Sequence, residues 1–112
     1  MPLAFSQQPW IQFALVAIRV SSSSQIDTLV ENLAADNSVA REAAVARLTV
    51  FGARAVERLV AVAESNGPAI ARISAFRVLE AIGDPRALDA ALQSVRDNDT
   101  GIAGAALVVN LR

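Results

Sequence analysis

The sequence predicts an all-α protein, a short α-α superhelix of about three antiparallel helix pairs with an N-terminal capping helix. Two stretches, residues 39–52 and 70–83, match one another at an offset of 31 residues. Apolar residues before, between and after these stretches recur with the spacing of one helix face. Glycine and an Asp-Pro pair fall where such helices have to end and begin.

The internal repeat is carried by identical residues. Five pairs match at an offset of 31: Ala40/Ala71, Arg41/Arg72, Ala44/Ala75, Leu48/Leu79 and Gly52/Gly83. A third copy, matched at an offset of 32, keeps Ile102, Ala103 and Leu111. A lone helix pair cannot bury its own apolar face, so repeating units stack against their neighbours. We expect units at about 25–52, 53–83 and 84–112.

The first helix of each unit has its own apolar face. Its residues follow the i, i+3, i+4, i+7 spacing that places side chains on one side of a helix. The three sets are Ile26, Leu29, Val30 and Leu33; Val56, Leu59, Val60 and Ala63; and Leu88, Ala91, Leu92 and Val95. Each unit is therefore expected to be two amphipathic helices.

The helix ends are marked by residues with special backbone preferences. Gly52 and Gly83 stand where a helix needs a left-handed residue to end it. Asp84 can accept hydrogen bonds from free N–H groups, and Pro85 suits the first helical position. Ser24, with an acid three residues later, resembles a capping box. We therefore expect the repeats to begin after residue 24.

Residues 1–24 form a separate N-terminal segment. Its apolar run from Trp10 to Ile18 predicts a helix over residues 9–20 that caps the first pair, with a β-strand or a partner-bound segment as alternatives. The serines at 21–24 predict a flexible turn. The apolar run is too short to span a bilayer and has no basic segment before it. We therefore expect a cytoplasmic protein without a membrane partner.

These residues resemble HEAT repeats, in particular the bacterial HEAT-like repeats of phycobilin lyases. The resemblance covers about 25–112 and is clearest in Ile82-Gly83-Asp84-Pro85-Arg86-Ala87. It implies a right-handed solenoid, the form of superhelix in which such helix pairs stack. Repeats of this kind occur in scaffolds, adaptors, enzyme subunits and lyases alike, so the resemblance indicates fold more than function.

The resemblance also implies a ladder of side chains between neighbouring repeats. In that family an acidic residue of the turn pairs with an arginine of the second helix. Asp36 and Arg41 match this pattern, and Asn66 with Arg72 matches in part. Gly104 replaces the arginine in the third copy, so the ladder is expected to end there.

The composition removes most catalytic chemistry. The chain has no His, Cys, Lys or Tyr, which excludes imidazole bases, thiolate nucleophiles, Schiff bases and phenolic acids. Only carboxylates, hydroxyls and arginines remain. We therefore predict that the protein is not an enzyme and has no cofactor.

Three groups of polar residues are candidate sites. Residues 97–101 resemble the start of a calcium loop, but Val108 stands where the bidentate Glu is required, so a capping turn is favoured and no metal is predicted. Glu80 and Asp84 could form an acid/base pair, yet capping or solvated roles are commoner. Arg41 and Arg72 could bind an anion, but the structural ladder is favoured.

The leading hypothesis is a protein-interaction module that binds a protein or peptide on the concave face lined by the second helices. That face is mixed and mildly apolar. Its expected residues are Glu42, Ala46, Thr49, Ile73, Arg77, Glu80 and Val109. The alternative, a bilin lyase or lyase-accessory subunit, follows from the resemblance alone. DNA binding, as in alkylpurine glycosylases with HEAT-like repeats, is disfavoured by a net charge of -1 without a basic cluster.

The last helix pair is expected to have an apolar surface that another surface must bury. Leu107, Val108 and Leu111 are apolar, and no polar capping helix follows them. End repeats normally carry a polar outer face. We therefore expect either self-association through the C-terminal helix pair or a natural solenoid that continues beyond residue 112.

Overall fold

The computed structural model describes residues 22–111, and every regular element in this part is helical, which confirms the all-α prediction. A first helix covers residues 22–32. It is followed by α2 Ser38–Phe51, the 3₁₀ turn η2 Gly52–Ala55, α3 Val56–Glu64, α4 Ala69–Ile82, the 3₁₀ turn η3 Pro85–Ala87, α5 Leu88–Ser94 and α6 Thr100–Asn110. No helix among these residues is long and apolar enough to cross a membrane.

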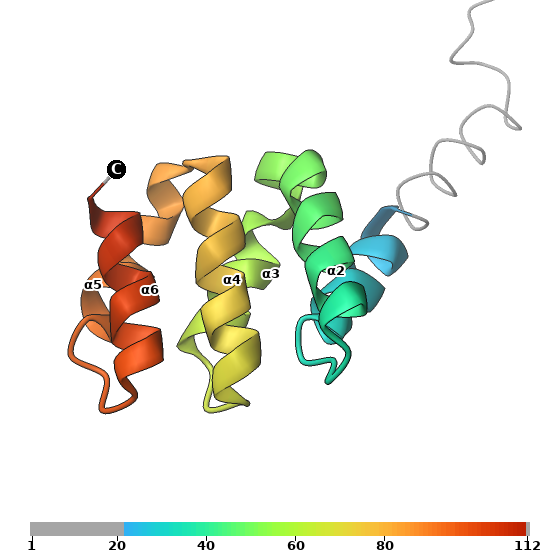
Figure 1. Ribbon diagram of the computed structural model, residues 1–112. Coiled ribbons are helices and arrows are strands. Elements are labelled where there is room, and N and C mark those ends of the chain that lie inside the picture. Colours follow the sequence, from blue (N-terminus) through green and yellow to red (C-terminus); the bar gives the residue numbers. More distant parts are fainter. Residues whose placement is uncertain (1–21, 112) are drawn as a thin grey trace, which may run out of the picture.

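The helices form two layers. Figure 1 shows α2, α4 and α6 side by side, with α4 in the middle, and α3 and α5 behind them. Helix α4 packs against α2, α3 and α6, and α5 packs against α6. The two matching stretches 39–52 and 70–83 thus lie next to each other in α2 and α4. The apolar faces of these helices are buried against neighbouring helices in the same and the opposite layer.

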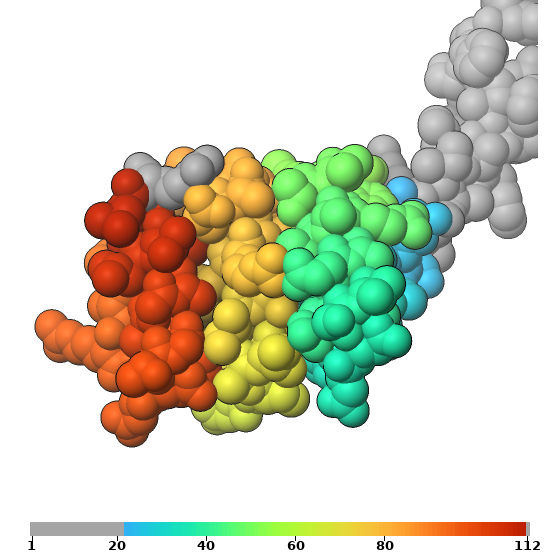
Figure 2. Space-filling model, in the orientation of Figure 1, coloured from blue at the N-terminus to red at the C-terminus, as the bar shows by residue number. Residues whose placement is uncertain are grey.

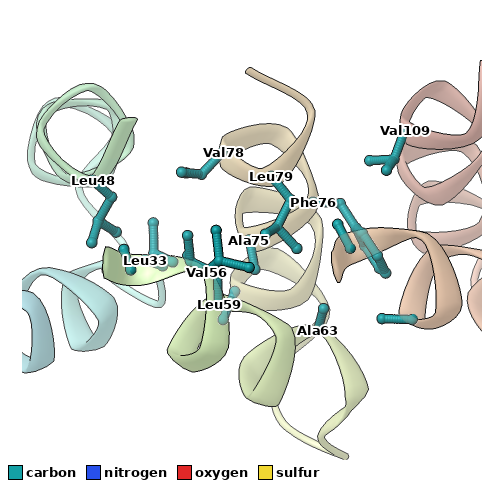
Figure 3. Close-up of a cluster of buried hydrophobic side chains, with 14 of the residues drawn as sticks. Leu33, Leu48, Val56, Leu59, Ala63, Ala75, Phe76, Val78, Leu79 and Val109 are labelled. Carbon is teal, nitrogen blue, oxygen red and sulfur yellow. The ribbon is translucent and has the colours of Figure 1, made fainter. Parts of the chain in front are cut away.

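The core is built from small and branched apolar side chains. Ala44, Ala75 and Ala106 are buried at equivalent positions of α2, α4 and α6, and small residues there let helices approach closely. Figure 3 shows Phe76 pointing from α4 toward the last two helices, on the side where Val109 lies. Phe76 is fully buried and is the largest side chain of the core. The remaining fully buried large residues are Leu33, Leu48, Leu59, Leu79, Val56 and Val78.

The helix starts show that the third copy keeps the offset of the first two. The residues that cap α2, α4 and α6 are Asn37, Pro68 and Asp99, each 31 residues after the previous one. The offset of 32 expected for the third copy is therefore wrong for α6. The one-residue error rotates the expected side-chain directions by about 100°, and this changes the candidate site described below.

The helix ends follow from local hydrogen bonding. Asn37 accepts hydrogen bonds from the N–H groups of residues 39 and 40, and Asp99 accepts from those of residues 101 and 102. Gly52 and Gly83 end α2 and α4 with positive φ angles of 62° and 74°. Asp84 caps η3, and Pro85 occupies its first position. These residues stop each helix so that the next one can return along it.

The serine-rich turn expected before the first repeat is wrong where the structure describes it. Residues 22–24 are helical, and the hydroxyl of Thr28 donates to the carbonyl of Ser24 within the same helix. Serine is a weak helix breaker, and burial of Ile26, Leu29 and Leu33 along one face outweighs its preference for turns. The expected capping helix over 9–20 lies outside the described residues.

Candidate functional site

The face formed by α2, α4 and α6 carries most of the residues expected to bind a partner. We call it the α2–α4–α6 face, and Figure 2 shows it from outside, with the three helices adjoining one another. Glu42, Ala46 and Arg77 are exposed on it. Thr49, Ile73 and Glu80 are partly buried. Six of the seven expected residues are therefore at least partly open to solvent.

A pair of opposite charges joins α2 to α4 on this face. Arg77 donates from Nη1 to Glu42 Oε2 at 2.7 Å and from Nη2 to Oε1 at 2.8 Å, which is a bidentate contact. These hydrogen bonds lower the pKa of Glu42 and raise the pKa of Arg77. Both side chains remain about half exposed, so the pair contributes little to stability. Its polar groups are accessible between α2 and α4.

Two of the partly buried residues are held by their neighbours. The hydroxyl of Thr49 donates to the carbonyl of Val45 at 2.8 Å. Ile73 extends toward the start of α6, where its Cδ1 would lie 2.9 Å from a Cβ added at Gly101. Gly101 thus leaves room for Ile73 between α4 and α6. Both residues support the shape of the face more than they offer free groups to a partner.

Val109 does not belong to this face. It is only 5% exposed and is part of the core, so the expectation that it faces a partner is wrong. The cause is the register: at the observed offset of 31, Arg77 is equivalent to Val108 and Glu80 to Leu111. Both Val108 and Leu111 are exposed. Val108 of α6 and Leu111, which directly follows α6, continue the face.

Sequence reasoning also missed exposed aliphatic residues of the same face. Val39 and Val50 flank Ala46 at i−7 and i+4 on α2, and Val50 is 87% exposed. Ile70, equivalent to Val39, is exposed on α4. Residues at these spacings share one side of a helix. Because Ala46 was expected on this face, the same spacing could have predicted that Val39 and Val50 lie on it too. The α2–α4–α6 face is therefore more apolar than expected.

The arginines of the predicted ladder make different contacts from those expected. Arg72 donates from Nε to the carbonyl of Ala63 at 3.0 Å, and its Nη2 lies 3.1 Å from Oδ2 of Asp97. Its partner is thus an acid of the following turn, and the expected pairing with Asn66 is wrong. Arg41 bonds turn carbonyls instead of a carboxylate, at 2.7 Å from that of Ala35. The carbonyl oxygen of Asp36 lies farther from Nη1 of Arg41, at 3.5 Å.

Other arginines join neighbouring helices in the same way. Arg58 of α3 pairs with Asp27 of the first helix. Arg86 donates from Nε and Nη2 to the carboxylate of Asp84, at 3.0 and 2.9 Å, and from Nη2 to the carbonyl of Ala53 at 3.1 Å. These hydrogen bonds lower the pKa of Asp84 to about 2. Much of the arginine content is therefore used between helices.

The aspartates that were candidates for metal binding or acid/base chemistry make structural contacts instead. Asp97 accepts from the N–H of Asp99 at 2.9 Å in addition to its contact with Arg72. Asp99 caps α6, and Asp84 is held by Arg86. Within residues 22–111, no group of three or more His, Cys, Asp or Glu side chains could hold a metal ion. The turn over 97–101 therefore acts as a cap.

Shallow hollows open on the described part of the surface, and two of them lie at the ends of α4 and α2. One, of about 170 Å³, lies where α4 ends, and its lining includes Leu79, Glu80, Leu88 and Val109. The other, of about 280 Å³, is lined by Arg47, Val50, Phe51 and Arg54. The guanidinium carbon of Arg54 lies 5.2 Å from the centre of the Phe51 ring. Both hollows are smaller than the pockets that enclose most small-molecule ligands.

No family model matches this chain, and no curated protein matches it. The class of protein is therefore argued from the residues and from their arrangement.

Proposed function

We propose that this chain is a HEAT-like solenoid module that binds a protein or peptide on the α2–α4–α6 face. The observation that carries this proposal is the continuous side-by-side layer of α2, α4 and α6, with exposed aliphatic residues around the Glu42–Arg77 pair. Each helix pair repeats the same outward positions, so the layer presents one extended surface.

The assignment to HEAT-like repeats is supported by register and by side-chain contacts. Helix caps recur every 31 residues along α2, α4 and α6. Arg72 reaches the acidic turn of the next unit, as a ladder between stacked pairs requires. The helices form two layers, and each helix pair packs against the pair that precedes it in the sequence. This arrangement is typical of a solenoid, in which each unit buries the apolar side of its neighbour.

The composition of the face suits a protein or peptide. Val39, Val50 and Ile70 supply exposed apolar area on α2 and α4, and Val108 extends it on α6. The Glu42–Arg77 pair is a neutral polar centre with hydrogen-bonding groups of both kinds. A nucleic acid would need a clustered positive charge instead, because phosphate contacts dominate its binding. Interfaces with proteins combine apolar area with a few polar groups in this way.

The test is affinity capture with mass spectrometry, using a matched pair of alanine substitutions. Ala46→Glu places a charge on the exposed side of α2, one helical turn from Glu42, whereas Ala61→Glu places the same charge at an exposed position of α3 in the other layer. We expect Ala46→Glu to lose the proteins that the wild-type chain captures and Ala61→Glu to retain them. Circular dichroism should show both variants folded. If both variants capture the wild-type set, the face is assigned wrongly.

A further inference from the structure

The C-terminal end of the helix stack exposes positions that are buried inside it. Phe76, the eighth residue of α4, is fully buried, whereas Leu107, the eighth residue of α6, is 52% exposed. Val60, the fifth residue of α3, packs against the core, whereas Leu92, the fifth residue of α5, is 59% exposed. We call the surface around Leu92 and Leu107 the end face.

The end face also lacks the arginine that bridges helix pairs elsewhere. Arg72 of α4 reaches Asp97 of the next turn, but its equivalent in α6 is Ala103. Covering the end face would therefore bury no charge at this position, and so would avoid the large cost of burying an unpaired charge. The end face can therefore pack against another apolar surface.

We propose that the end face binds the end face of a second copy of this chain across a two-fold axis. The charges beside it are self-complementary. Asp89 lies in the first turn of α5 and Arg96 lies two residues beyond its last residue, so the two charges stand near opposite ends of this helix, with Leu92 between them. Both residues are exposed, and neither side chain has a hydrogen bond or ion pair with another residue of the described range 22–111. When two α5 helices meet antiparallel at Leu92, Asp89 faces Arg96 of the second copy, and the reverse contact forms as well.

This arrangement accounts for the apolar and the charged residues together. Leu92 and Leu107 supply area that leaves water, and the two ion pairs fix the direction of the helices. A two-fold contact uses the same surface on both copies, so assembly stops at the dimer. The end of one helix pair is small, which places the contact among the weaker interfaces. We expect dissociation in the micromolar range or above.

Sedimentation equilibrium over a range of concentrations tests the contact. We expect the wild-type chain to shift from monomer to dimer as concentration rises and Leu107→Glu to remain monomeric. Ala61→Glu, which carries the same new charge on α3, should dimerise as the wild type does. A wild-type chain that is monomeric at all concentrations overturns the proposal, as does growth beyond the dimer or a Leu107→Glu variant that dimerises normally.

Charge reversal tests the two-fold geometry itself. Asp89→Arg and Arg96→Asp each place like charges opposite one another at both contacts, so each should dimerise roughly tenfold or more weakly. A mixture of the two variants restores opposite charges at both contacts and should form a heterodimer. If the mixture associates no better than either variant alone, the antiparallel contact is refuted. Capture of other proteins on the α2–α4–α6 face is measured separately, so either proposal can fail without the other.

Discussion

Gly83 and Gly104 differ in the backbone conformation that they require. Gly83 ends α4 with φ of 74°, a conformation that L side chains rarely adopt. Gly104 lies inside α6, where φ is not positive. A Cβ added at either position would meet nothing within 4 Å. The two sites therefore separate the effect of backbone conformation from that of packing.

We predict opposite signs for the same substitution at these two positions. Gly83→Ala should lower the free energy of unfolding by about 1 kcal/mol or more, because alanine is strained in the left-handed region. Gly104→Ala should raise it by about 0.5–1 kcal/mol, because alanine favours the helix. Urea denaturation followed by circular dichroism measures both. Changes of the same sign would show that the assigned conformation of one glycine is wrong.

The carboxylate of Asp84 predicts a pH dependence of stability. Its pKa falls from 3.8 to about 2 because Arg86 donates to it through its side chain and backbone. A carboxyl with a lowered pKa in the folded state stabilises the protein fully above its unfolded pKa. That contribution disappears as pH falls from about 4 to about 2.

The variant Asp84→Asn keeps a capping side chain and removes the charge. Its melting temperature should lie below that of the wild type at pH 6, and the gap should close as pH approaches 2. The exposed Asp89 has no such partner in the described residues, so Asp89→Asn at dilute protein concentration serves as the control. A gap for Asp84→Asn that is constant over this pH range would contradict the assigned pairing with Arg86.

At the scale of elements, the same position has different consequences inside the stack and at its end. Phe76 of α4 is fully buried, and its equivalent Leu107 of α6 is half exposed. Phe76→Ala should lower the free energy of unfolding by about 3–5 kcal/mol through the cavity that it leaves. Leu107→Ala should cost less than about 1 kcal/mol in dilute monomer. Comparable losses in denaturant titrations would show that Leu107 is packed against further chain.

The elements themselves were largely predictable, and the site was predictable only in part. The spacing of apolar residues and the positions of capping residues predicted α2 to α6, because both act within a few residues of the chain. The turn expected over residues 22–24 was wrong because burial of Ile26 and Leu29 outweighed the local preference of serine. Val109 was misplaced because a one-residue error in the register of a helix moves a side chain from the surface to the core.

At the scale of the whole molecule, α4 is the centre of the packing. It contacts α2, α3 and α6 and buries Ala71, Ser74, Ala75, Phe76, Val78 and Leu79. We predict that the amide hydrogens of α4 exchange most slowly, because they open only when the neighbouring helices separate. Those of α5, with seven residues at one end of the described stack, should exchange faster. Hydrogen exchange with mass spectrometry resolves the two, and slower exchange in α5 would contradict this account of the core.

Local sequence was enough to predict that this chain forms helices, where most of them end, and which side chains repeat. These properties depend on contacts within a few turns, so spacing and residue type suffice to predict them. The packing of the helices was needed to learn which arginine meets which acid, that Val109 is buried, and that Leu107 is exposed where Phe76 is buried. Those outcomes depend on the rotation and closeness of helices that are distant in the sequence, and a small change in register alters them all.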